Sequence, residues 1–170
     1  MTRCMAHARW ATMLALLVGV VPAGAQVPRG AVPASASAAE GAQVARALRA
    51  VFSAAERGDL AALDTLYAGD SLTIVEGAGI NRGWSDYRDH HLAPELKEMK
   101  NLRYQPSDLE VHVVQGSAWV LFRYALKAEV DGRAADVVGR GTAVLERRGP
   151  RWVVRHMQTS GRARRPGDPA

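Results

Sequence analysis

The stretch of sequence that decides the fold is SAWVLFRYALKAEV-DG-RAADVVGRGTAVLERR, residues 117–148. Its two halves are long, and their apolar residues recur with the period of two that is typical of a β-strand. The dipeptide Asp131-Gly132 stands between the halves, and Asp-Gly between two such segments is a strong signal for a tight hairpin. The stretch therefore predicts two antiparallel strands, 117–130 and 133–148.

Two further extended segments flank this hairpin. Residues 109–114 precede it across the turn Gln115-Gly116, and residues 152–160 follow it after a turn that contains Gly149-Pro150. Both segments are bounded by turn residues, as strands usually are. The C-terminal half of the chain is therefore expected to form an antiparallel meander.

The helical patterns all precede this meander. Over residues 39–57 the apolar residues recur at helical spacing, which predicts an amphipathic helix that Gly58 ends. Asp59 can cap a second, short helix. A third helix is expected from Ser85, and Pro94 should end or kink it because proline lacks a backbone donor. The stripe of the first helix is Val44, Leu48, Val51, Phe52 and Ala55, and a short hairpin (72–76 and 80–82) separates the other two helices.

This order of elements, helices first and then a meander, favours an α+β fold over an alternating α/β fold. The strands are too long for the short helices to cover completely. We therefore expect a strongly curved antiparallel sheet, closed by three N-terminal helices around a pocket.

The N-terminus has the three parts of a secretory signal. Arg3 and Arg9 give a basic start, residues 10–21 are apolar but too short to span a bilayer, and Ala23-Gly24-Ala25 is a small-residue cleavage site. An uncleaved membrane anchor is the alternative. Cleavage near Ala25 would remove Cys4, the only cysteine, and would leave a periplasmic or secreted protein with no disulfide and no membrane span.

The distribution of charge argues against a nucleic-acid partner. The net charge of +5 suggests one, but residues 40–160 contain 16 basic and 16 acidic side chains. The excess lies at the two ends of the chain, and no basic stripe is left for a phosphate backbone. We expect a signal peptide (1–25), a flexible leader (26–39), one domain (40–161) and a disordered basic tail (162–170).

Four segments together resemble a known family. They are residues 54–63 (AAERGDLAAL), 75–77 (VEG), 87–96 (YRDHHLAPEL) and 152–161 (WVVRHMQTSG). Their order and spacing resemble the SnoaL-like, ketosteroid-isomerase-like branch of the nuclear transport factor 2-like superfamily over residues 40–161. The resemblance implies a cone-shaped α+β barrel with a central cavity, which commonly forms a homodimer through the sheet.

Candidate catalytic residues follow from strand alternation, which predicts that Leu72, Ile74 and Glu76 share a face. If that face lines the cavity, Glu76 meets a histidine of the third helix, His90 or His91. A carboxylate and an imidazole in a partly apolar cup are the minimum for acid/base chemistry. Alternation also predicts one common face for Trp152, Val154, His156, Gln158 and Ser160.

We therefore expect Glu76, His91 and His156 to be catalytic if the protein is an enzyme. The same three side chains could conceivably hold zinc, although no tight metal motif is present and no metal or other cofactor is expected. A buried Glu76–His156 pair with a purely structural role is the other possibility. The expected ligand-binding residues are Trp84, Tyr87, His90, His91, Gln158 and Ser160.

Two functions remain open at this point. The first is an exported module that binds a small organic ligand, an acidic one included, in the central cavity. The alternative is an acid/base enzyme (isomerase, cyclase-type lyase or hydrolase) that uses the Glu/His pair. Arg123 and Arg140 lie within strands and would favour an anionic ligand if they point into the cavity, or cross-strand ion pairs if they point outward.

Overall fold

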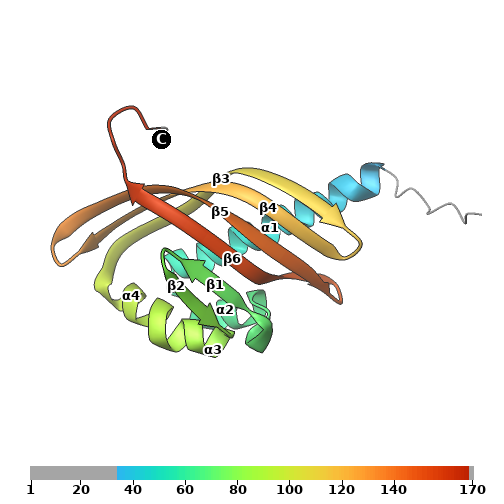
Figure 1. The fold of residues 1–170 in the computed structure, drawn as a ribbon, viewed down its shortest axis with the longest axis horizontal. Helices are drawn as coiled ribbons and strands as arrows, with labels where there is room; N and C mark the ends of the chain where they lie inside the picture. Colours follow the sequence, from blue (N-terminus) through green and yellow to red (C-terminus); the bar gives the residue numbers. More distant parts are fainter. Residues whose placement is uncertain (1–33, 169–170) are drawn as a thin grey trace, which may run out of the picture. The chain divides into compact units, whose positions relative to one another are not determined.

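The fold is taken from a computed structural model that describes residues 34–168. The expected signal peptide, 1–25, and residues 26–33 of the expected leader lie outside the described residues. Within them, one six-stranded curved sheet is packed against helices, so the predicted α+β class is confirmed (Figure 1).

The sheet has the strand order β2-β1-β6-β5-β4-β3. Neighbouring strands are antiparallel except for β1 and β6, which run parallel. The β3–β4 and β4–β5 turns contain Gln115-Gly116 and Asp131-Gly132, all with positive φ, as a tight two-residue hairpin turn requires. The strands are β1 (Thr73–Glu76), β2 (Gly79–Arg82), β3 (Met99–Val114), β4 (Ser117–Val130), β5 (Arg133–Arg148) and β6 (Arg151–Ala163).

The helices lie on the concave face of the sheet (Figure 1). The long helix α1 (Ala34–Glu56) packs on β3 and β6 through its predicted stripe, which is buried throughout. Asp59 caps α2 (Leu60–Leu66) by accepting a hydrogen bond from the backbone of Ala62. Within residues 34–168, these two α-helices and a 3₁₀ turn, η1 (Gly69–Ser71), precede the first strand. The third expected helix follows β2 and has three parts: α3 (Trp84–Tyr87), a π-helical turn (Arg88–Leu92) and α4 (Ala93–Glu98).

Glycines in β5 allow aromatic rings to cover the concave face. Gly139 faces Tyr124 across β4, and Gly141 faces Phe122. A Cβ at either glycine would overlap the ring opposite it. The two rings, together with Phe52 of α1, form part of the buried core.

The edge strand β3 is longer than the predicted 109–114. It begins at Met99 and includes Pro106, which an edge strand tolerates because its outer N–H groups have no ladder partner. Bulges near Asn101 and Asp108, both with positive φ, interrupt the alternation that would have revealed the strand. Two side chains of α1 also bond its backbone: Arg49 donates to the Pro106 carbonyl, and Glu56 accepts from the Tyr104 N–H.

A bulge in β6 overturns the predicted common face of this strand. Val144 pairs with His156 whereas Leu145 pairs with Val154, so Arg155 is an extra residue. The side chains before the bulge (Trp152, Val154) and after it (Met157, Thr159) are buried on the concave face. His156, Gln158 and Ser160 therefore lie on the convex face, because one inserted residue reverses the alternation.

Regular structure extends past the predicted bounds of the domain at both ends. Helix α1 begins at Ala34, inside the segment 26–39 that was expected to be a flexible leader. The expected disordered tail, 162–170, contributes Arg162 and Ala163 to β6. Asp168 then accepts two hydrogen bonds from the Arg162 guanidinium, both of 2.7 Å, which hold the tail against the sheet.

Candidate functional site

Glu76 is the last residue of β1 and faces the concave side of the sheet, as predicted from its alternation with Ile74 and Leu72. The parallel pairing of β1 with β6 places it beside Thr159. The Thr159 hydroxyl donates to its Oε1 over 3.3 Å, and the Tyr87 hydroxyl donates to its Oε2 over 3.4 Å. The carboxylate is therefore fixed from two sides.

The π-helical turn brings His91 to this carboxylate. The Ala93 N–H bonds the carbonyl of Arg88, five residues back, and Pro94 follows without an N–H of its own. Single π-turns of this kind are frequent at functional sites. His91 Nε2 lies 3.1 Å from Glu76 Oε2 and 3.2 Å from Glu95 Oε1.

Of the two adjacent histidines, His91 faces the site and His90 faces solvent. The His90 side chain is 76% exposed and pairs with Asp86 on its own helix, with 3.1 Å between Nδ1 and Oδ1. This separation follows from the turn of about 100° between successive helical residues.

Asn81 determines the proton arrangement on His91. Its Nδ2 donates to Asp86 over 3.0 Å, so its Oδ1 faces His91 Nδ1 at 3.1 Å. An amide oxygen only accepts, so Nδ1 of His91 carries a proton. The other ring nitrogen, Nε2, lies within hydrogen-bonding distance of two carboxylates, those of Glu76 and Glu95.

The surroundings of the pair favour protonated groups. Burial raises the pKa of Glu76, and the negative charge of Glu95 raises it further, while the charge of His91 opposes both. Burial likewise holds the pKa of Tyr87 well above its usual range, so its hydroxyl remains a hydrogen-bond donor. The side chains of Glu76 and His91 are nevertheless 26% and 25% exposed, so a ligand can reach them from solvent.

Aromatic residues form the wall beside the pair. The Trp84 and Tyr67 rings lie 4.9 Å apart between centroids, and the Tyr87 ring lies 5.3 Å from the imidazole of His91. The indole N–H of Trp84 donates to Asp64 of α2. Tyr87 is thus buried in contact with Glu76 and His91, and Trp84 is buried beside Tyr87, with 6.2 Å between the ring centroids. Both were expected to bind ligand, and that role stays a prediction.

Three of the expected site residues lie elsewhere. The β6 bulge places His156, Gln158 and Ser160 on the convex face, so His156 does not meet Glu76 or His91. The conceivable zinc set of Glu76, His91 and His156 is therefore not brought together. Within residues 34–168, no group of three or more His, Cys, Asp or Glu side chains has the arrangement of a metal site.

Two contributors to the site were missed from the sequence. Asn81 could have been found, because a two-residue turn at Gly77-Ala78 makes it the partner of Ile74 in the β1–β2 hairpin. Thr159 could not, because its position on the concave face depends on the β6 bulge, for which the alternation gives no signal.

Comparison with known proteins agrees with this architecture. The model of the SnoaL-like domain matches residues 44–163, well over half of the chain. The chain belongs to the SnoaL-like family. No curated protein matches this SnoaL-like chain. Within residues 34–168, none of its helices is long and apolar enough to cross a membrane.

Solved structures with the same fold include three bacterial proteins. A proposed ketosteroid isomerase from Shewanella frigidimarina is 21% identical, with 69% of this chain and 94% of that chain covered and a TM-score of 0.63. A nuclear transport factor 2-like protein from Salmonella enterica is 16% identical (78% and 99% covered, TM-score 0.66). A proposed dehydratase from Streptomyces avermitilis is 19% identical (75% and 99% covered, TM-score 0.67). At these identities the SnoaL-like chain shares their fold alone.

Proposed function

We propose that this SnoaL-like protein binds a small organic molecule beside Glu76 and His91 and uses the pair to move a proton on that molecule. The observation that carries the proposal is the 3.1 Å contact between Glu76 Oε2 and His91 Nε2, in side chains that solvent can still reach. A carboxyl group and an imidazole that share a proton can accept one from a ligand and return it at another position.

The surroundings of the pair support this role. A carboxyl group whose pKa is raised by burial is a better base at neutral pH than an ordinary glutamate, because its affinity for a proton is higher. The protonated hydroxyl of Tyr87 is oriented towards the same carboxylate. Isomerisation and elimination next to a carbonyl both need such a transfer, and two of the similar structures are described as a proposed ketosteroid isomerase and a proposed dehydratase.

A non-catalytic binding module is the second candidate, and a specific observation favours it. Glu76, His91 and Asn81 already satisfy one another through bonds within the protein. A pair of this kind can serve only to position the π-turn against β1. The experiment must therefore separate binding from proton transfer.

Native mass spectrometry of protein isolated from the producing cells would first identify a bound molecule by its mass. That compound would then be incubated with the protein in D₂O, with exchange of carbon-bound hydrogen followed by NMR. Proton transfer by the pair predicts exchange that Glu76→Gln reduces by about a hundredfold or more with binding retained. His112→Gln, a change on the convex face, is the matched control. Binding without exchange would favour the non-catalytic module.

Two further parts of the proposal concern location and assembly. Export to the periplasm or beyond is supported by the basic, apolar and small-residue parts of the first 25 residues. A homodimer through the sheet is supported by Trp119 and Leu121, which are each 41% exposed on the convex face of β4.

A further inference from the structure

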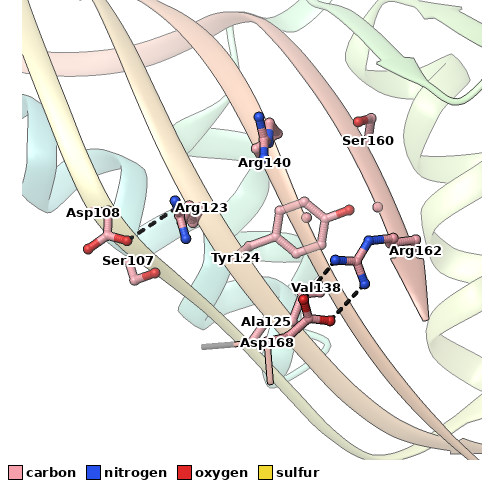
Figure 2. Close-up of a pocket in the computed structure, with 12 residues that line it drawn as sticks. Ser107, Asp108, Arg123, Tyr124, Ala125, Val138, Arg140, Ser160, Arg162 and Asp168 are labelled. Carbon is pink, nitrogen blue, oxygen red and sulfur yellow. Dashed lines mark hydrogen bonds and ion pairs between the residues drawn. The ribbon is translucent and has the colours of Figure 1, made fainter. Parts of the chain in front are cut away.

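A hollow on the convex face of the sheet gathers three arginines from three neighbouring strands. Arg123 of β4 pairs directly with Arg140 of β5, which pairs in turn with Ser160 of β6. Arg162 joins them from the end of β6. All three arginines and Ser160 line a hollow of about 380 Å³ (Figure 2).

The register forces this gathering of positive charge. Phe122 and Tyr124 point into the core, so Arg123 between them must point outward. The position of Arg140 between two glycines that face the core has the same consequence. Like charges directly opposite each other in a sheet are destabilising, so this arrangement calls for negative charge to offset it.

The protein supplies part of that negative charge itself. Asp108 lies 3.6 Å from the Arg123 guanidinium, and the Asp168 carboxylate binds Arg162 with both oxygens (Figure 2). Arg140, between them, has no acidic partner among the described residues 34–168. Glu110 lines the adjoining hollow with Arg140 but is paired with His112, 2.8 Å away, so Arg140 is the arginine of this group that is left for an outside anion.

We propose that the hollow is a binding site for a small organic acid, whose carboxylate pairs with Arg140. The two-oxygen contact between Asp168 and Arg162 demonstrates that a carboxylate fits the arginines of this hollow. A carboxylate can bond the Arg140 guanidinium in the same manner and accept a hydrogen bond from the neighbouring Ser160 hydroxyl. The outward-facing arginines thus bind an anion on the side of the sheet opposite to Glu76 and His91.

This site is independent of the proposed acid/base pair. It lies on the other face of the sheet and shares none of its residues. The C-terminal tail would regulate this site. Asp168 is paired with Arg162 and so lowers the net positive charge of the hollow that attracts an organic acid. Removing the Asp168 charge should therefore strengthen binding.

The test uses the purified protein titrated with succinate at low ionic strength, where exposed charges are least screened. Binding would be followed by isothermal titration calorimetry and by NMR shifts of the Arg side chains, with the uncharged succinamide as the control ligand. Arg140→Gln should weaken succinate binding about tenfold or more, as the loss of a charge-assisted hydrogen bond does. Arg133→Gln, at an exposed arginine of the same strand, should leave it unchanged, while Asp168→Asn should tighten it several-fold.

Three results would overturn the proposal. The first is that succinamide binds as well as succinate does. The second is that Arg140→Gln binds succinate like the parent protein. The third is that Arg140→Gln changes only the molecular mass measured by light scattering, because Arg140 would then pair with an acidic side chain of a second copy instead of a free acid.

Discussion

At the scale of single residues, the candidate site depends on how Glu76 is surrounded. Its carboxyl group contacts His91, Tyr87 and Thr159, and burial raises its pKa. Each partner therefore changes the proton affinity of the Glu76 carboxyl group.

One prediction concerns the pH dependence of stability. A raised pKa means that the folded protein holds the Glu76 proton more tightly than the unfolded chain does. The resulting stabilisation is complete below the ordinary value of 4.5 and is lost as the pH rises through the raised folded value. Glu76→Gln, which stays neutral, should lack this loss. The free energy of unfolding, measured by urea denaturation from pH 4 upward, should therefore be similar for parent and variant at low pH. As the pH rises, the parent should become less stable than the variant. A constant difference between the two at all pH values would contradict the raised pKa.

A second prediction concerns Tyr87. Its hydroxyl stabilises the ionised carboxylate and so lowers the pKa of Glu76 against the effect of burial. Tyr87→Phe should raise that pKa further, as measured by ¹³C NMR of the Glu76 carboxyl group. Tyr67→Phe, a change in the same aromatic cluster at a ring with no bond to Glu76, should leave it where it was. A lower pKa of Glu76 in the Tyr87 variant would contradict the role of the Tyr87 hydroxyl in stabilising the ionised carboxylate.

At the scale of elements, regular patterns were predictable and local insertions were not. The α1 stripe, the Asp59 cap and both two-residue hairpin turns are present as their residues indicated. The same alternation that placed Glu76 correctly failed for His156, because Arg155 inserts one residue into β6. The π-turn that selects His91 over His90 was also beyond the sequence, since Pro94 signals an interruption without specifying its form.

Replacing Gly139 would show how much the stability of the sheet depends on glycine at its concave face. A methyl group there would overlap the Tyr124 ring and the Ser160 carbonyl. Because Ser160 contributes backbone, the clash cannot be relieved by a side-chain rotation alone. Gly139→Ala should lower the free energy of unfolding by about 1–3 kcal/mol, the usual cost of overpacking. The midpoint of urea denaturation measures this, and an unchanged midpoint would mean that the strands can separate without cost.

At the scale of the whole molecule, the convex face of the sheet is where the expected homodimer would form. Trp119 and Leu121 lie on that face, and the imidazole of His112 stacks on the Trp119 ring at 3.7 Å between centroids. These apolar side chains lie towards the β3–β4 turn, and the arginine hollow follows further along β4. Leu121 lines a hollow together with Arg123 and Arg140, so a dimer formed through these apolar side chains would reach the rim of the arginine hollow.

We expect light scattering to give the mass of a dimer and Trp119→Glu to give that of a monomer. The new carboxylate would have to lose its water at an apolar contact that lies further from Arg123 and Arg140 than Leu121 does, which destabilises the dimer. Ile80→Glu, at an apolar residue of β2 that is 57% exposed, is the matched control and should remain dimeric. A parent protein that is monomeric at all concentrations would refute the expected homodimer.

The irregular edge strand β3 also has a meaning for solubility. A free sheet edge of sixteen residues can template the addition of strands from other molecules, the first step of fibre growth. Here Pro106 removes one donor, two bulges twist the edge, and Arg49 and Glu56 of α1 occupy an acceptor and a donor that an incoming strand would need. The features that hid β3 from sequence reasoning thus protect the molecule against polymerising through its own backbone.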